Sequence, residues 1–129
     1  MFVSGTSSRR PDNTIAGVEV DEMGTTAVDA GVQTTEVLRN IERILNTVGL
    51  DRTDLVDATV FLVSMNDFGD YNRAWAEFFD DPAFPDCVAP ARTTVAVHQL
   101  PHPHLVIEVK ATALRRPGTV EEGQREEGQ

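Results

Sequence analysis

Residues 55–79 read LVDATVFLVSMNDFGDYNRAWAEFF, and this stretch decides the fold class. From Leu55 to Met65 it is rich in valine, leucine, phenylalanine and threonine, which predicts a central strand covered on at least one face. Aromatic residues then recur at helical spacing, so a helix with a core-facing stripe is expected over residues 68–79, capped by Asn66 or Asp67. The members of the stripe are Phe68, Tyr71, Trp75 and Phe78.

Weaker patterns on either side complete the predicted order of elements. The remaining expected elements are strands at Phe2–Thr6, Ile15–Val20, Thr93–Gln99 and Leu105–Ala113 and a helix at Ala30–Val48 followed by Gly49. Residues 1–116 would form one domain, and residues 117–129 a disordered acidic tail. This order predicts an α+β fold in which two helices pack on one face of a mixed sheet. Because two helices leave the other face bare, an oligomer is expected.

Composition excludes several classes of protein. The formal net charge of -10 argues against nucleic-acid binding, which needs clustered lysine and arginine. No apolar run is long enough for a membrane span, and a single cysteine, Cys87, allows no internal disulfide, so a cytoplasmic protein is expected. In so acidic a chain, a binding site for an anion must be a local positive pocket.

Sequence motifs for phosphate loops, zinc sites and serine hydrolases are absent. His102 and His104 flank Pro103 and could imitate a pair of metal ligands. No third ligand or orienting carboxylate accompanies them, so no metal is expected.

Arg92 and Glu108 carry the strongest chemical signal. Arg92 opens an otherwise apolar strand, and Glu108 stands between Ile107 and Val109. If the last two strands pair antiparallel through residues 100–105, these side chains lie near the same end of the sheet. An arginine fork binds a carboxylate at two points, and a partly buried glutamate can activate water. From the residues alone, a structural ion pair is an equal alternative.

Several motifs together resemble the Rid (YjgF) family in order and nearly in spacing. They are Phe2-Val3-Ser4-Gly5, Asp67-Phe68, Asn72, Trp75, Phe78-Phe79, Pro90-Ala91-Arg92, Leu100-Pro101 and Ile107-Glu108. The resemblance covers Phe2 to Ala113. It implies a chorismate-mutase-like fold assembled as a homotrimer, whose trimers could pair into hexamers, with pockets between subunits. It also implies hydrolysis of enamines and imines to carbonyl compounds and ammonia, without a cofactor.

The resemblance assigns roles to individual residues. Arg92 would grip the carboxylate of a small enamine substrate, and Glu108 would position the hydrolytic water. Helix packing explains Asn72 about as well as a place near the site. The residues expected to bind substrate are Arg92, Thr94, Ser4, Gly5 and Asn72.

The segment Ser7–Thr14 departs from the usual Rid pattern and resembles the branch that deaminates 2-aminomuconate to 4-oxalocrotonate in the catabolism of aromatic compounds. A dicarboxylate needs a second cation, which Arg9 or Arg10 would supply, although two solvated arginines in a turn are an equal alternative. Lys110 replaces a family glutamate, and the strand that usually precedes Phe2 is not found in this sequence. The rival hypotheses are a general deaminase of 2-aminoacrylate or 2-iminobutanoate and a non-enzymatic ligand-binding trimer.

Overall fold

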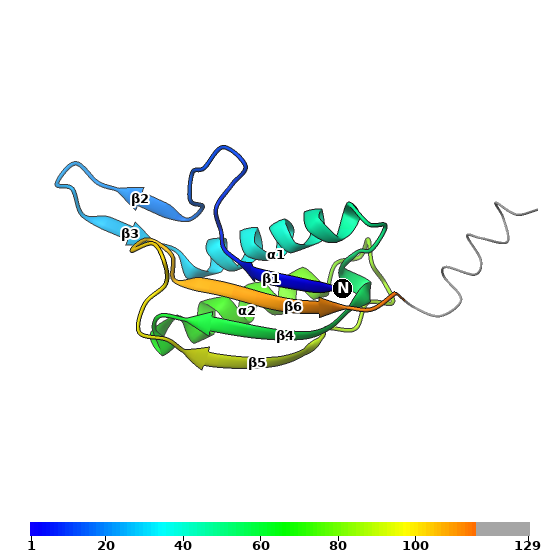
Figure 1. Ribbon diagram of the computed structural model, residues 1–129. Coiled ribbons are helices and arrows are strands. Elements are labelled where there is room, and N and C mark those ends of the chain that lie inside the picture. Colours follow the sequence, from blue (N-terminus) through cyan, green and yellow to red (C-terminus); the bar gives the residue numbers. More distant parts are fainter. Residues whose placement is uncertain (116–129) are drawn as a thin grey trace, which may run out of the picture.

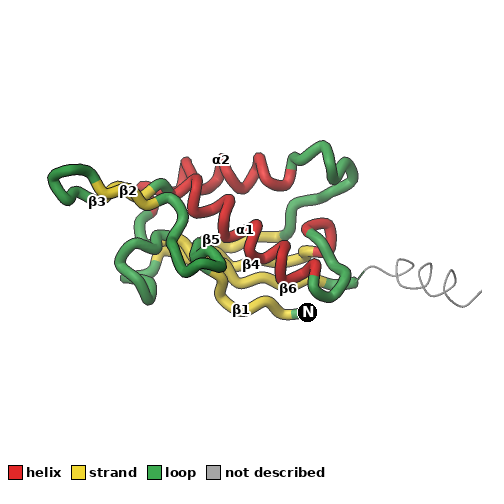
Figure 2. The backbone as a smooth tube through the Cα atoms, turned by 90° about the horizontal axis from the view of Figure 1, so that it is seen from above, coloured by secondary structure: helices red, strands yellow, loops and turns green. Residues whose placement is uncertain are grey.

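The structure is a computed structural model that describes residues 1–115 (Figure 1). One sheet has the strand order β1-β6-β4-β5, with β1 (Phe2–Thr6), β4 (Leu55–Leu62), β5 (Ala91–Ala96) and β6 (Ile107–Ala113). β6 is antiparallel to β1 and β4, and β5 is parallel to β4. The helices α1 (Ala30–Asn46) and α2 (Phe68–Phe79) cover one face of the sheet, as Figure 2 shows. The predicted α+β fold is confirmed; the predicted tail lies outside the described residues.

Helix α1 begins and ends where local chemistry favours it. The Asp29 carboxylate accepts a hydrogen bond from the N–H of Val32 at 3.0 Å and so caps the first turn. The helix ends at Asn46, two residues before the expected end, and Gly49 adopts a left-handed φ of 76° that reverses the chain. Its inner stripe is completely or almost completely buried and consists of Val37, Leu38, Ile41 and Leu45.

Helix α2 has the bounds that the aromatic stripe predicts. Asp67 occupies the capping position, but its side chain makes no capping hydrogen bond. Burial, and then the nearby charge of Asp70, raise the pKa of the Asp67 carboxyl above its usual value. Two 3-10 turns, Arg52–Asp54 and Met65–Asp67, precede β4 and α2 respectively. Among residues 1–115, neither helix is long and apolar enough to cross a membrane.

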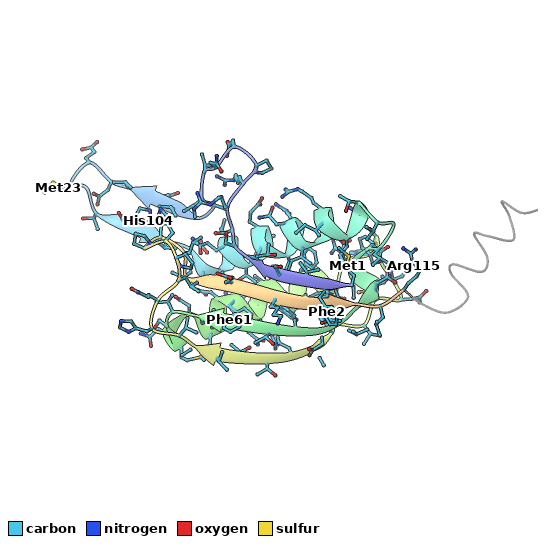
Figure 3. The ribbon with its side chains drawn as sticks, viewed as in Figure 1. Met1, Phe2, Met23, Phe61, His104 and Arg115 are labelled. Carbon is cyan, nitrogen blue, oxygen red and sulfur yellow. The ribbon has the colours of Figure 1, made fainter. Side chains whose placement is uncertain are left out.

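The strand expected over Ile15–Val20 is shorter and lies outside the main sheet. Only Val18–Val20 (β2) is extended, and it pairs with β3 (Thr26–Val28), which the sequence did not predict. The resulting hairpin projects from the body of the molecule, with Met23 at its tip (Figures 1 and 3). The short run Thr26–Val28 has too little apolar periodicity to stand out in the sequence.

The expected pairing of the last two strands is wrong, because β4 lies between β5 and β6. The connection from β5 to β6 crosses the end of β4 and is tied to it on both sides. The N–H of Val97 donates to the carbonyl of Leu62 at 2.8 Å, and the N–H of Val63 donates to Val106 at 3.1 Å. The apolar strand β4 thus gains partners along both edges, which a direct hairpin between β5 and β6 would not provide.

Candidate functional site

Arg92 lies on β5 and faces the helices. Its Cα pairs with Ala58, a buried residue of β4, so both side chains point to the helix-covered face. Because β5 is an edge strand, the guanidinium remains exposed. Its Cζ lies 5.1 Å from the ring centroid of Trp75 and 5.2 Å from that of Tyr71. The aromatic residues of α2 therefore form a wall on which the cation rests.

Two consecutive residues of α2 hold the Arg92 guanidinium. Nη1 donates to the hydroxyl of Tyr71 at 3.0 Å, and Nη2 donates to Oδ1 of Asn72 at 2.8 Å. A guanidinium has further N–H groups, which no recorded contact among residues 1–115 occupies. This arginine is therefore oriented by the protein and still has donors for a carboxylate.

Thr94 shares a partner with Arg92. Its Oγ1 lies 2.7 Å from the hydroxyl of Tyr71, and it faces the helices from the next inward position of β5. Sequence reasoning placed Tyr71 only in the core-facing stripe and missed this contact. The available signal was the single hydroxyl in a stripe of phenylalanine and tryptophan, since a buried phenol requires a hydrogen-bond partner.

Glu108 lies on the opposite face of the sheet. It pairs with Phe61 of β4, while its neighbours Ile107 and Val109 point into the core. The carboxylate lies over Gly5 of β1, where a Cβ would come 2.1 Å from Oε1 of Glu108. Glycine at this position therefore leaves the space that the glutamate occupies. Ser4, the preceding residue, is exposed and its carbonyl accepts a hydrogen bond from Thr6.

The two predicted carriers of the chemistry are not brought together within one chain. Arg92 faces the helices, Glu108 faces away from them, and β4 separates their strands. No structural ion pair joins them among the described residues. A pocket that contains both must therefore include residues of more than one chain.

Arg9 and Arg10 lie in the loop between β1 and β2, which Figure 1 shows above α1. Nη1 of Arg9 donates to the carbonyl of Asn13 at 3.4 Å, and Nη1 of Arg10 donates to Oγ1 of Thr14 at 3.3 Å. The Asn40 amide, from α1, ties the loop down by donating to the carbonyls of Ser7 and Arg9. Neither Arg92 nor Glu108 lines the hollow of about 570 Å³ beside Arg10.

Two of the histidines in the connection between β5 and β6 contact each other. The N–H of His104 donates to Nδ1 of His102 at 3.0 Å, and their ring centroids lie 5.1 Å apart. The part of the chain that the structure describes contains no cluster of three or more His, Cys, Asp or Glu side chains arranged to hold a metal ion.

Comparison with known proteins places these features in a family context. Residues 1–115 match the family model described as endoribonuclease L-PSP. The chain is 42% identical over 78 residues to a RutC family protein of Sulfurisphaera tokodaii, a match covering 60% of this chain and 58% of that protein. It is 36% identical over 93 residues to 2-iminobutanoate/2-iminopropanoate deaminase of Salmonella typhimurium, covering 72% and 70% respectively. The chain thus spans less than two thirds of the RutC family relative.

Two solved structures have the same fold. E. coli TdcF with bound serine superposes with a TM-score of 0.71 at 29% identity, covering 89% of this chain and 80% of that one. The YjgF gene product of E. coli superposes with a TM-score of 0.70 at 30% identity, with the same coverage.

Proposed function

This chain belongs to the family described as endoribonuclease L-PSP, and we propose that it is a cofactor-independent hydrolytic deaminase of small enamine and imine carboxylates. The names of relatives in Salmonella and E. coli, 2-iminobutanoate/2-iminopropanoate deaminase, support this chemistry. The acidic net charge of -10 favours a small substrate over the RNA that the family description suggests.

The observation that carries the proposal is the held but incompletely occupied guanidinium of Arg92. Tyr71 and Asn72 each accept one of its hydrogen bonds, and donors remain for a substrate carboxylate. A planar fork that is fixed before the ligand arrives loses little entropy on binding.

The proposed site lies between two copies of the chain. Arg92 of one copy and Glu108 of another would meet in it, because their orientations within one chain are opposite. The open sheet face supports such an assembly, since it exposes the large apolar side chains Phe2 and Val95. We propose a homotrimer, in which three such faces turn inward and three equivalent sites form; trimers could pair into hexamers.

The reaction needs orientation and proton transfer. An enamine takes a proton at carbon and becomes an imine, water adds to the C=N carbon, and the tetrahedral intermediate expels ammonia and leaves a carbonyl group. Arg92 would hold the carboxylate, with Thr94 beside it. Glu108 would take a proton from the attacking water and return one to the departing amine.

A finer proposal concerns the substrate. 2-Aminomuconate, which would yield 4-oxalocrotonate in the catabolism of aromatic compounds, carries a second carboxylate that a second arginine could bind. Arg9 and Arg10 are exposed, and each guanidinium has one recorded hydrogen bond, within its own loop. The names of the relatives favour 2-iminobutanoate instead, so the two substrates are rivals.

Steady-state release of ammonia from both substrates tests the proposal and separates the rivals. Arg92→Ala should abolish turnover of either one. Arg9→Ala or Arg10→Ala should lower kcat/KM for 2-aminomuconate about thirtyfold, equivalent to about 2 kcal/mol, and leave 2-iminobutanoate unaffected. Equal effects on both substrates would mean that these arginines do not bind the second carboxylate and are simply solvated in their turn. Absence of ammonia release from either substrate would favour a ligand-binding trimer, and an RNA-cleavage assay checks the activity in the family description.

A further inference from the structure

Tyr71 is the one aromatic residue of the α2 stripe that touches the candidate site through a polar atom. Its side chain is 0% exposed, and its ring packs edge-on against Phe68 and Trp75. Its hydroxyl lies 3.0 Å from Nη1 of Arg92 and 2.7 Å from Oγ1 of Thr94. One buried oxygen therefore contacts both side chains that face the proposed carboxylate.

The direction of these hydrogen bonds follows from their chemistry. Arg92 can only donate, so the Tyr71 oxygen accepts from it. A buried phenol whose own proton has no acceptor is destabilised, because the hydrogen bond that it made to water in the unfolded chain is not replaced. The geometry of the Tyr71–Thr94 contact admits either oxygen as the donor, and pairing of the buried phenol proton selects Thr94 Oγ1 as its acceptor. The chain of donors therefore runs from Arg92 to Tyr71 to Thr94, and the Thr94 proton is left to point elsewhere.

The guanidinium is held from two sides. Tyr71 and Asn72 are consecutive in α2, and consecutive helical side chains point about 100° apart. Tyr71 accordingly reaches Arg92 from the buried side of the helix and Asn72 from the exposed side. Two contacts at different nitrogens fix both the position and the plane of the fork.

We propose that Tyr71 is a positioning residue of the carboxylate site: its hydroxyl fixes the Arg92 fork and directs the Thr94 hydroxyl proton toward the bound substrate. This inference rests on the proposed function, because it assigns Tyr71 a role in recognition of the carboxylated substrate. The site then offers donors from two side chains of β5, arranged by one residue of α2. Recognition would depend on a phenol that need not contact the substrate.

Tyr71→Phe tests the inference, because it keeps the ring and removes only the hydroxyl. We expect KM for ammonia release from 2-iminobutanoate, and Kd for the product 2-oxobutanoate measured by calorimetry, to rise about tenfold, while kcat changes less than threefold. Thr94→Val should act similarly, and Thr94→Ser should restore wild-type values. The double variant Tyr71→Phe/Thr94→Val should have about the same KM and Kd as either single variant, because both substitutions break the same hydrogen-bond network.

Thr93→Val is the matched control, because Thr93 is the neighbouring hydroxyl of β5 and faces the opposite side of the sheet. It should leave KM and Kd unchanged. If Tyr71→Phe lowers only the melting temperature and leaves KM and Kd within about twofold of wild type, the inference is overturned while the deaminase proposal stands. If no ammonia is released but Kd still weakens in Tyr71→Phe, the proposed function fails and the positioning role stands. If the wild type neither releases ammonia nor binds 2-oxobutanoate, both proposals are overturned.

Discussion

Helices α1 and α2 cover one face of the sheet and leave the other face open (Figure 2). On the covered face, alternate side chains of β4 and β6 are almost completely buried, whereas the side chains between them on the open face stay accessible. Val60 and Val109 represent the first set, and Phe61 and Glu108 the second. Figure 3 shows Phe61 and Phe2 on the side turned away from the helices. The covered face therefore contributes most of the buried apolar area that stabilises the fold, and the open face keeps both charged and apolar side chains exposed.

Arg92 lies on the helix face and is nevertheless available to a ligand. Its position on the edge strand allows this, because no further strand covers the outer side of β5 within the described chain. Changes on the open face should therefore alter turnover with little effect on stability. Changes of core residues beneath the helices should do the reverse, except at Arg92 and at the two residues of its network, Tyr71 and Thr94.

Among changes on the open face of the sheet, Glu108→Gln should give the largest effect on turnover. Removing a general base typically costs 10²–10⁴-fold, so we expect kcat to fall by about 10³ while the melting temperature shifts by only about one or two degrees. Asp57→Asn is a matched control, since it neutralises another carboxylate of the open face. Equal losses in the two variants would contradict a specific role for Glu108.

Arg52→Ala should give the largest loss of stability. Arg52 is 7% exposed, donates to both oxygens of Glu42 at 2.7 Å and to the carbonyl of Phe78, and lies between the rings of Phe78 and Phe84. Burial acts to lower the pKa of Arg52, but its hydrogen bond to Glu42 and the charges of Glu42 and Asp81 raise it overall. The side chain thus remains charged.

The loss should be about 3 kcal/mol, because the variant leaves Glu42 partly buried without its partner. Chemical denaturation measures it. Arg39→Ala, which removes an exposed arginine 3.9 Å from Glu36, should cost less than about 0.5 kcal/mol. Similar losses in both variants would show that burial does not distinguish these two ion pairs.

Gly5→Ala and Gly69→Ala make the same substitution at two places, in β1 beside Glu108 on the open side of the sheet and in α2 on the helix side. An alanine Cβ at Gly5 would displace the Glu108 carboxylate, which is the far end of a flexible side chain, so we expect kcat to fall about tenfold while the fold survives. Nothing lies within 4 Å of a Cβ at Gly69 in α2, so that change should stabilise the protein by about 0.5 kcal/mol and leave kcat unchanged. An unchanged kcat in Gly5→Ala would mean that the placement of Glu108 over β1 is not used in catalysis.

Asp67→Asn should give the smallest effect, and one that depends on pH. Since the folded state raises the pKa of Asp67, the charged carboxylate lowers stability increasingly as pH rises above its unfolded value near 3.8. The asparagine variant lacks this penalty, so it should be more stable at pH 7 by less than about 0.5 kcal/mol, because solvent screens the site. The gain should vanish below pH 3.8 in paired melting curves, and a gain that persists there would have another cause.

Local pattern was sufficient for the elements with strong periodicity. The aromatic spacing predicted the bounds of α2, and the apolar run after Leu55 predicted the central strand, because burial of one face imposes a period on the residues that form it. Asn72 accepts a hydrogen bond from Arg92, and its expected place in a substrate site stays a prediction. Strand β3 was missed because its three residues are too few to show a pattern.

The sequence by itself determined that two helices cover one face of a sheet. It also determined that Arg92 and Glu108, which are suited to carboxylate binding and to proton transfer, lie in strands. Only the tertiary structure decided that β4 separates their strands, that the two side chains face opposite ways, and that Tyr71 joins Arg92 to Thr94. The physical reason is distance along the chain. Periodicity reports which side of an element is buried, whereas the choice of strand neighbours and of hydrogen-bond partners depends on packing between segments far apart in sequence.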